Sequence, residues 1–281
     1  MKYLFYVAKK YSIPIIKPLA SELKKRDKKF CFYVSDKVYN SAPDNWNNVY
    51  TDLTKAKQFN PDFVLCPGNF VDFRIPGVKV QTFHGLGIEK PVHYKIRHFF
   101  DIYLTSGPYV TEKFRQLKEK HGYFDIIETG WPKIDYIINF PVQNIHKKYN
   151  VPRNRNIILY APTFSSKMES ASDLLGIIPN IIRDDEFWIF KFHELMDDKI
   201  INEFITRTPA NVKIVKSEDI TPYLNLADIM ISDTSSVIYE FMVLNKPVVT
   251  YQTIERKEKG ININQPEQLR PSIDKYLNNS S

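Results

Sequence analysis

The feature that most constrains the fold is an alternation of short apolar runs with helical patterns along nearly all of the 281 residues. Short apolar runs are typical of strands buried on both faces, and such strands separated by helices form parallel sheets covered by helices. We therefore predict an α/β fold. Strands are predicted at 3–7, 30–34, 63–66, 79–82, 102–105, 124–128, 156–160, 187–192, 212–215, 229–231 and 248–249. Helices are predicted at 13–25, 52–59, 91–99, 109–120, 173–183, 199–206, 220–225, 237–244 and 266–277.

The alternation is interrupted once, over residues 131–155, by several prolines and a polar, basic run. Such segments are typical of connections between domains. We therefore predict two doubly wound domains, an N-terminal domain over residues 1–140 and a C-terminal domain over residues 141–281. Ligands of doubly wound sheets bind beyond the carboxyl ends of the strands, so a ligand cleft is expected between the domains.

Composition excludes several classes of protein. With 9 glycines, the chain has neither the dinucleotide fingerprint nor the P-loop pattern, so side chains and helix N-termini would have to bind any phosphate. Cys31 and Cys66 lie in apolar strand-like runs, which indicates buried thiols in a reducing compartment. The N-terminus predicts a strand rather than a signal peptide, and no apolar run approaches the roughly 20 residues of a membrane span. The expected location is the cytoplasm.

The formal net charge of +7 is concentrated in basic clusters over residues 17–29, 90–98 and 113–120. Such clusters suit a solvated surface, a polyanionic substrate or peripheral contact with the acidic inner face of the cell membrane. No fold signature of nucleic-acid recognition accompanies them, so no nucleic-acid partner is expected. The histidines and cysteines lack the spacing of a metal site, and no metal is predicted.

Residues 226–249 predict a strand, a polar turn, a helix and a second strand. Thr234, Ser235 and Ser236 lie in the turn where the helix begins, and Glu240 follows one turn later. Because helix N-termini present unpaired N–H groups and a partial positive charge, this turn predicts a seat for a diphosphate, with Glu240 directed to a ribose. The same residue types are also common as helix caps and solvated side chains.

Two histidines each follow a predicted strand. His84 comes after the apolar run 78–83, and His193 comes after the strand 187–192. Histidine exchanges a proton near neutral pH, which makes both candidates for acid–base chemistry in a cleft. Lys191 and His193 alternate on one strand face and can contact the same ligand. The structural alternatives are a hydrogen bond from His84 to a loop carbonyl and a strand-edge charge at Lys191.

Further candidates lie in the loops. Gly85 and Gly87 allow a sharp turn after His84. Thr163 and the serines at 165–166 follow a predicted strand and have hydroxyls that could bind phosphate or simply solvate the loop. Lys133 lies in the connection and could reach the cleft or serve only to mark the turn.

These motifs together resemble a known family. They occur in the order seen in the CDP-glycerol glycerophosphotransferases, the teichoic-acid primases and polymerases and their capsule-synthesis relatives, over about residues 80–280. The chain departs from the family at Glu194, where proline is common, and at Thr234, where tyrosine is common, and it is short for a polymerase. The matching segments are Phe83–Lys90, Glu128–Asp135, Leu159–Phe164, Lys191–His193 and Ile231–Phe241.

The resemblance implies a GT-B architecture of two facing Rossmann-like domains. It also implies transfer of a polyol phosphate from a CDP-linked donor to an acceptor hydroxyl, lipid-linked or on a glycan, with release of CMP and no further cofactor. His84 is then expected to be the general base and His193 a donor to the transferring phosphoryl group. Ser235 and Ser236 would bind the diphosphate, and Glu240 would lie near the ribose.

Two other functions stay open at this point. A nucleotide-sugar glycosyltransferase or a UDP-sugar epimerase would share the predicted architecture and phosphate-binding turn. A non-catalytic module that binds a nucleotide or a polyanion would share the scaffold without turnover. A preference for cytidine over uridine nucleotides would exclude the glycosyltransferase and the epimerase, and release of CMP would exclude the non-catalytic module.

Overall fold

The structure is a computed structural model that describes residues 1–86, 91–165, 168–215, 219–253 and 257–278. The chain divides into two compact units, residues 1–136 and 137–281. The boundary lies inside helix α5 (Pro132–Ile138), a few residues before the predicted position between residues 140 and 141.

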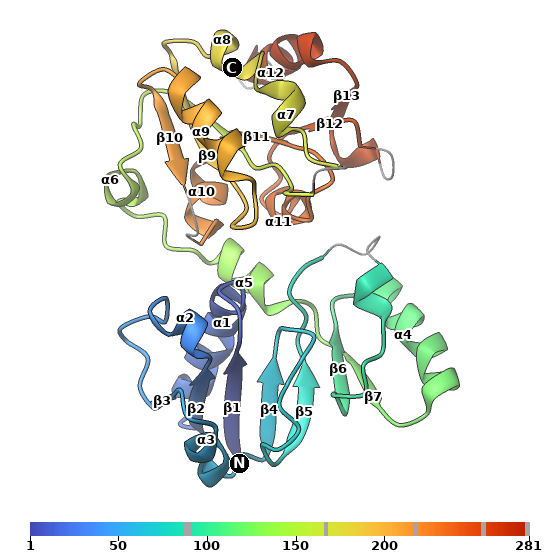
Figure 1. Cartoon of the computed structure of the whole chain (residues 1–281). Helices are drawn as coiled ribbons and strands as arrows, with labels where there is room; N and C mark the ends of the chain where they lie inside the picture. The colour runs from blue at the N-terminus through green and yellow to red at the C-terminus, as the bar shows by residue number, and fades with distance from the viewer. Residues whose placement is uncertain (87–90, 166–167, 216–218, 254–256, 279–281) are drawn as a thin grey trace. The chain divides into compact units, whose positions relative to one another are not determined.

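The first unit is built on a seven-stranded sheet in the order β3-β2-β1-β4-β5-β6-β7, and all its recorded pairings are parallel. Figure 1 shows its central strands in blue to cyan. The strands are β1 (Lys2–Val7), β2 (Lys29–Val34), β3 (Val49–Tyr50), β4 (Phe63–Cys66), β5 (Val78–Gln81), β6 (Ile102–Thr105) and β7 (Asp125–Glu128). The helices are α1 (Ser12–Lys25), α2 (Asp36–Tyr39), α3 (Leu53–Phe59), α4 (Pro108–His121) and the 3-10 turn η1 (Pro91–Tyr94).

Both faces of this sheet are buried because successive side chains of a strand point to opposite sides. Phe5 and Val7 of β1 pack with Ile16 and Ala20 of α1 on one face. Leu4 and Tyr6 lie in the cluster of the other face, which also contains residues of α3 and α4. This double covering explains why the strands appear in the sequence as continuous apolar runs rather than as alternating patterns.

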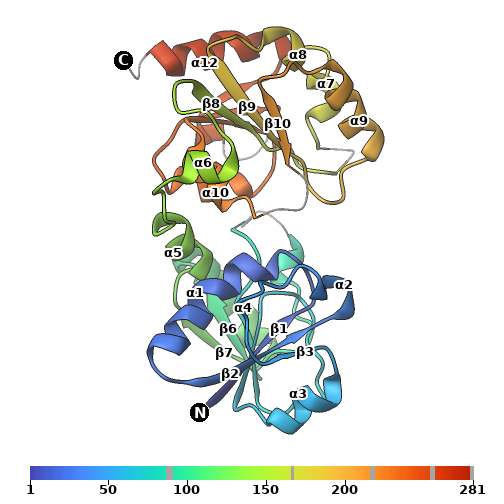
Figure 2. The ribbon, with the colours of Figure 1, turned by 90° about the vertical axis from the view of Figure 1, so that its left-hand side faces the viewer.

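The second unit is built on a six-stranded sheet in the order β10-β9-β8-β11-β12-β13, again with parallel pairings. Figure 2 shows α12 and α9 at its periphery. The strands are β8 (Asn156–Tyr160), β9 (Glu186–Lys191), β10 (Val212–Val215), β11 (Ile229–Ser232), β12 (Val248–Tyr251) and β13 (Ile261–Ile263). The helices are α6 (Ile145–Tyr149), α7 (Ala171–Leu174), α8 (Ile178–Ile181), α9 (Asp198–Arg207), α10 (Thr221–Leu226), α11 (Val237–Met242) and α12 (Leu269–Asn278), with 3-10 turns η2 (Lys257–Lys259) and η3 (Pro266–Gln268).

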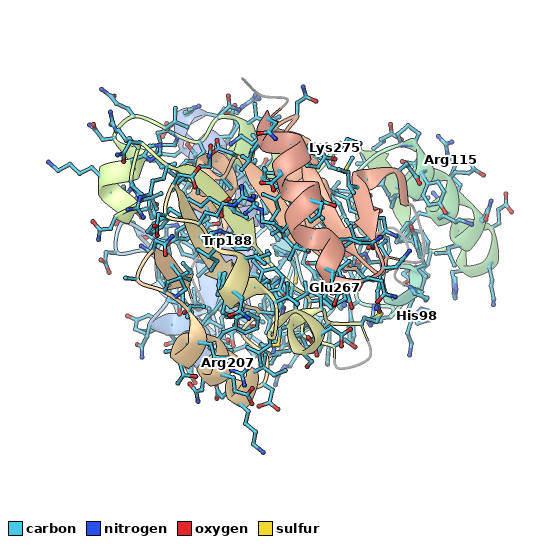
Figure 3. The ribbon with its side chains drawn as sticks, turned by 90° about the horizontal axis from the view of Figure 1, so that it is seen from above. His98, Arg115, Trp188, Arg207, Glu267 and Lys275 are labelled. Atoms are coloured by element: carbon cyan, nitrogen blue, oxygen red, sulfur yellow. The ribbon has the colours of Figure 1, made fainter. Side chains whose placement is uncertain are left out.

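Helices α7, α8, α9 and α12 supply apolar side chains to one large cluster around Trp188 of β9. Trp188 is fully buried and is labelled among the elements of this unit in Figure 3, as is Lys275 on α12. The indole N–H of Trp188 donates to Glu186 Oε2 at 2.8 Å, so the ring is fixed at its polar end as well as packed.

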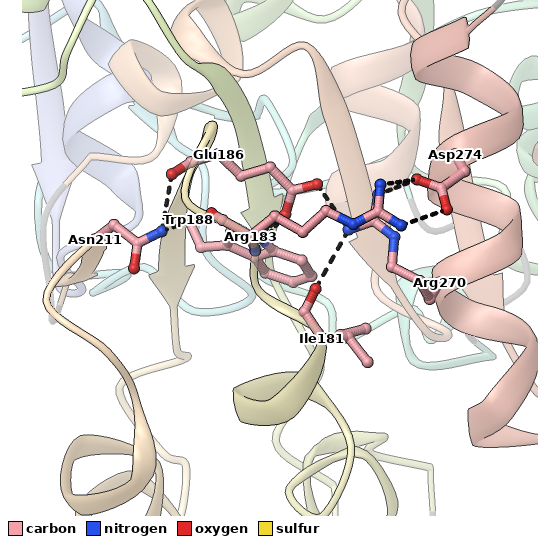
Figure 4. A network of polar contacts seen from close by, with 7 residues as sticks. All are labelled: Ile181, Arg183, Glu186, Trp188, Asn211, Arg270 and Asp274. Atoms are coloured by element: carbon pink, nitrogen blue, oxygen red, sulfur yellow. Dashed lines mark hydrogen bonds and ion pairs between the residues drawn. The ribbon is translucent and has the colours of Figure 1, made fainter.

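Glu186 is the buried centre of a polar network at the start of β9. Arg270 Nη1 of α12 donates to Glu186 Oε1 at 2.6 Å, and its Nη2 donates to Asp274 Oδ1 at 2.6 Å. Arg183 completes a two-pronged contact with Asp274 at 2.8 and 2.9 Å (Figure 4). The network attaches α12 to the end of the sheet at which the strands begin.

Several predicted elements differ from the structure. The segment 91–99 is helical only over η1, and the predicted helix 173–183 is two short helices, α7 and α8, separated around Gly176. The connection 131–155 contains α5 and α6, where no helix was predicted. Short elements bury too few side chains to leave a clear period in a sequence, which is why α2, β3 and β13 were missed as well.

Candidate active site

Each sheet reverses its strand order once, and polar residues gather at both reversals. In the first unit the reversal lies between β1 and β4, and in the second it lies between β8 and β11. The loops that leave two such strands diverge to opposite faces and leave a crevice between them, which is where doubly wound sheets bind ligands.

His84 lies in the loop after β5 and is half-buried. Its Nδ1 is 3.1 Å from the carbonyl oxygen of Pro67, in the loop after β4. A carbonyl oxygen can only accept, so Nδ1 carries the proton of the neutral ring and Nε2 carries the lone pair. The loop-carbonyl bond that the sequence offered as a structural alternative is therefore present, and it leaves His84 in the tautomer that a general base requires.

Two further rings hold the imidazole of His84. Tyr11, in the loop after β1, stacks on it with ring centroids 4.9 Å apart. His93 of η1 meets it edge-to-face at 5.2 Å. Loops from three strands therefore converge on one histidine, and the ring is positioned by a hydrogen bond and by two aromatic neighbours.

The sharp turn before His84 is made by Phe83, whose φ is 59°. A bulky residue rarely adopts the left-handed region, and such strain persists only where the surroundings hold it. Phe83 is buried and packs on Phe114, and its carbonyl oxygen accepts from Trp131 Nε1 at 3.5 Å. Gly85 follows His84 directly, and Gly87, the other glycine expected to allow a sharp turn there, lies outside the described residues.

A small cavity of about 10 Å³ adjoins this site and is lined in part by Gly85, His93 and Ser106. It has room for about one water-sized group. Lys133, the other candidate in this unit, is buried on α5 with its Nζ 5.7 Å from the centroid of the Trp131 ring. Lys133 therefore lies beside the tryptophan that donates to the carbonyl oxygen of Phe83.

In the second unit Asp233 organises the candidate phosphate-binding loops. Its carboxylate is buried and accepts from the backbone N–H of Thr163 at 2.9 and 3.1 Å. It also accepts from the N–H and Oγ of Ser170, each at 3.0 Å, and from the N–H of Ser235 at 3.2 Å. The loops after β8 and β11 are therefore joined at one carboxylate, which brings Thr163 and Ser235 together.

Burial raises the pKa of Asp233 above its ordinary value, while the N–H donors from Thr163 and Ser170 act in the opposite direction. Its own carbonyl oxygen accepts from Thr253 Oγ1 at 2.9 Å, which attaches the loop after β12 to the same point. Asp233 was not among the predicted site residues. A buried carboxylate next to a Ser–Ser pair gives no periodic signal, and its partners come from distant loops.

The predicted diphosphate seat differs from expectation in two respects. Helix α11 has only six residues, and the backbone N–H of Ser235 is already bonded to Asp233. Ser235 Oγ accepts weakly from Val237 N at 3.5 Å, and Ser236 makes no side-chain cap. Thr234, Ser235 and Ser236 are half-buried, whereas Glu240 is 5% exposed and belongs to the interior of the unit.

His193 follows β9 and is exposed. Its Nδ1 accepts from the backbone N–H of Leu195 at 3.1 Å, so in the neutral ring the proton is on Nε2. Phe164 stacks on this imidazole with ring centroids 4.2 Å apart, which brings the His193 loop beside the Thr163 loop. Lys191 is half-buried and its Nζ donates to the carbonyl oxygen of Phe192 at 3.1 Å.

Within the second unit the structure thus groups Thr163, Ser235 and His193 through Asp233 and Phe164. Two exclusions hold for the described residues alone. No group of three or more histidines, cysteines or carboxylates there is arranged to hold a metal ion. No helix among them has both the length and the apolarity of a membrane span.

Two doubly wound sheets with polar side chains beyond the carboxyl ends of their strands are typical of nucleotide-binding proteins of the GT-B class. The family model described as CDP-glycerol:poly(glycerophosphate) glycerophosphotransferase matches residues 81–266. This match covers more than half of the chain, and the chain belongs to that family.

Its relatives include a Bacillus subtilis teichoic acid glycerol-phosphate primase, 30% identical over 180 residues that cover 62% of this chain and 44% of the relative. A Bacillus spizizenii primase is 27% identical over 162 residues, covering 56% and 41%. A Bacillus spizizenii teichoic acid poly(glycerol phosphate) polymerase is 26% identical over 220 residues, covering 61% and 50%. The chain spans half or less of the length of these relatives.

Among solved structures, the wall teichoic acid polymerase TagF has a TM-score of 0.71 at 17% identity, covering 99% of this chain and 81% of that one. A putative UDP-N-acetylglucosamine 2-epimerase from Listeria monocytogenes has a TM-score of 0.68 at 14% identity, covering 99% and 88%. Both solved structures resemble this chain in fold. The likeness to TagF confirms the predicted α/β fold of the GT-B type.

Proposed function

We propose that the chain transfers a polyol phosphate from a CDP-linked donor to an acceptor hydroxyl and releases CMP. One observation carries the proposal: the two histidines are held in opposite tautomers. His84 donates from Nδ1 and has its lone pair on Nε2, whereas His193 accepts at Nδ1 and has its proton on Nε2. One ring is therefore prepared to take a proton and the other to donate a hydrogen bond.

In the proposed reaction the acceptor hydroxyl oxygen attacks the phosphorus that bears the polyol. A new P–O bond forms, the P–O bond to CMP breaks, and the hydroxyl proton passes to Nε2 of His84. Negative charge develops on the phosphoryl oxygens and on the departing CMP. Phosphoryl transfer depends mostly on positioning and on stabilising this charge, so His193 Nε2–H and Lys191 Nζ have the appropriate chemistry in the donor-binding unit.

The hydroxyls of Thr163, Ser235 and Ser236 are proposed as donors to the diphosphate. Their loops are held in place by Asp233, so the hydroxyls need little ordering when a donor binds. Thr234 is included with them as a neighbour in the same turn. The scheme uses side chains of the chain and calls for no additional cofactor; treatment with a chelator is expected to leave turnover unchanged.

The acceptor is proposed to be a hydroxyl of a teichoic-acid-type polymer or of its lipid-linked precursor. The support comes from the primases and polymerases among the relatives. Such an acceptor would place the reaction at the cytoplasmic face of the membrane, and the basic clusters suit peripheral contact with acidic lipid there.

The test is donor profiling of the purified chain with CMP release as the readout. CDP-glycerol and CDP-ribitol are compared with UDP-N-acetylglucosamine, which addresses the epimerase fold neighbours directly. The proposal expects CMP release from at least one CDP-linked polyol and a loss of about 10²–10⁴-fold in His84→Ala. Stabilisation by the CDP-linked donor is expected to persist in this variant, as measured by thermal shift. Turnover of the uridine nucleotide alone would refute the proposal.

A further inference from the structure

The first unit contains a groove that the proposed reaction does not use. It has a volume of about 610 Å³ and lies between α1 and the loop that precedes β3. Three asparagines and a serine contribute to its lining, and no carboxylate is among the described residues that line it. We call it the lysine groove, after Lys17, Lys24, Lys28 and Lys29 in its walls.

The positive charge of the lysine groove is largely uncompensated. Among the described residues, the ammonium groups of Lys24, Lys28 and Lys29 have no recorded carboxylate partner, whereas the neighbouring Lys25 pairs with Glu22 on α1. Lys17 lies at another point of the wall, where its Nζ donates to Tyr136 Oη at 3.3 Å. A concave surface lined by several cations, with no carboxylate among its described lining residues, favours an anionic occupant.

The lysines are spread too widely for one small anion. Lys17 and Lys24 lie on one face of α1 two turns apart, which corresponds to about 10 Å along the helix axis. Lys28 and Lys29 follow the end of α1, at the turn into β2, and line the same groove. A single phosphate contacts only some of these lysines, whereas a chain with phosphates at regular intervals can contact several of them.

The floor of the groove is aromatic and recessed. Trp46 lies flat on Phe32 with ring centroids 3.9 Å apart and an interplanar angle of 3°. Phe32 is fully buried and Trp46 is half-buried, so neither ring projects as a membrane anchor would. An aromatic floor beneath lysines and asparagine amides suits a flexible chain of alternating hydrocarbon, hydroxyl and phosphate groups better than a flat bilayer surface.

We propose that the lysine groove binds a segment of a polyol-phosphate polymer and so acts as a second contact for the acceptor chain. The identity of this occupant rests on the proposed function. A polymer held in the groove would have its local concentration raised near the same molecule, so that longer acceptors would be favoured over short ones through multivalency.

The experiment measures binding of glycerol phosphate oligomers to the full chain by titration calorimetry in the absence of a nucleotide donor. Long and short oligomers are compared with glycerol phosphate alone and with vesicles containing phosphatidylglycerol. The test variant is Lys24→Gln with Lys28→Gln. The matched control, Lys25→Gln with Lys37→Gln, removes the same charge from exposed positions outside the groove. Thermal unfolding of both variants checks that they fold.

The expected result is an affinity that rises with oligomer length and falls about tenfold or more in the test variant. The control is expected to bind as the wild type does, and the salt dependence of binding is expected to be smaller in the test variant. The rate of transfer to a short acceptor is expected to be unchanged in both variants.

Three results would overturn the inference. These are equal binding of oligomers by the test variant and the control, equal affinity for glycerol phosphate and for long oligomers, and a loss in the test variant confined to vesicles. Because no donor is present, failure here is separable from failure of the proposed reaction. If the chain releases CMP but shows any of these results, the groove proposal alone is refuted. If it binds oligomers through the groove but never releases CMP, the proposed reaction alone is refuted.

Discussion

The Nδ1 atom of His84 lies 3.1 Å from the carbonyl oxygen of Pro67, and this contact decides which ring nitrogen is basic. An asparagine amide can keep a donor near the Nδ1 position, but no amide accepts a proton at neutral pH. His84→Asn is therefore expected to fold with a melting temperature close to that of the wild type and to lose about 10²–10⁴-fold in CMP release. A variant with near-normal turnover would remove His84 from the role of base.

At His193 the proposal predicts that two amide substitutions, glutamine and asparagine, differ in their effect on the rate. Glutamine places its amide N–H near the Nε2 position, whereas asparagine reaches only the Nδ1 position, where the native ring accepts from Leu195. Removal of one donor to developing charge typically costs about 10²–10³ in rate. We expect His193→Asn to show such a loss and His193→Gln to show a smaller one in initial rates. Equal losses would indicate that Nε2–H contributes nothing to the reaction.

The raised pKa of Asp233 predicts a pH dependence of stability. Because burial holds the folded-state pKa above the ordinary value of 3.8, the folded state binds more protons than the unfolded state just above that pH. The contribution of protonated Asp233 to the free energy of unfolding is fully present below pH 3.8 and is lost as pH rises through the folded-state pKa. Asp233→Asn removes it, so the wild-type minus variant difference in unfolding free energy should fall as pH rises. Urea titrations across this range measure it, and a difference that grows with pH would contradict the assignment.

The Glu186 network predicts unequal effects of two arginine substitutions. Arg270→Met leaves Glu186, which is 1% exposed in its side chain, without its cation, and loss of one partner of a buried pair costs about 3–5 kcal/mol. Arg183→Met breaks a pair in which the arginine side chain is 51% exposed, and should cost about 0–1 kcal/mol. Urea unfolding of both variants provides the comparison. Similar losses would show that the buried pair has no special weight.

The cysteines should resist thiol reagents in the folded protein. Desolvation raises the pKa of Cys31 and of Cys66 to about 12, so very little thiolate is present at pH 8. We expect slow labelling by a chromogenic disulfide reagent under native conditions and rapid labelling of both thiols in urea. Fast native labelling would mean that the strands carrying them open readily.

The strands were predictable because the parallel sheets bury them on both faces, so that β1, β4, β8 and β11 each appear as continuous apolar runs. Their order in the sheet was not predictable, because strand order depends on which crossovers pack and leaves no local trace. For this reason the sequence identified His84 but not its neighbour Tyr11, which comes from a loop more than seventy positions earlier.

The same limit applies to the second unit. The hydroxyls of Ser235 and Ser236 were predictable from a strand–turn–helix pattern, which the structure contains as β11 and α11. The bonds from the N–H groups of Thr163 and Ser170 to Asp233 were not, since they depend on how the loop after β8 folds back. The burial of Glu240 was missed because a single carboxylate on a short helix has the same pattern whether it faces water or the core.

The carboxylate of Asp233 means that the loops around Thr163, Ser170 and Ser235 already enclose an anion of their own. The bonds to Asp233 therefore fix the conformation of these loops, and a nucleotide would bind to a preformed surface. The same arrangement adds negative charge beside an incoming diphosphate. In the proposed reaction a bound diphosphate would need cationic side chains such as Lys191 to offset that charge, so donor affinity is expected to fall as salt screens those cations.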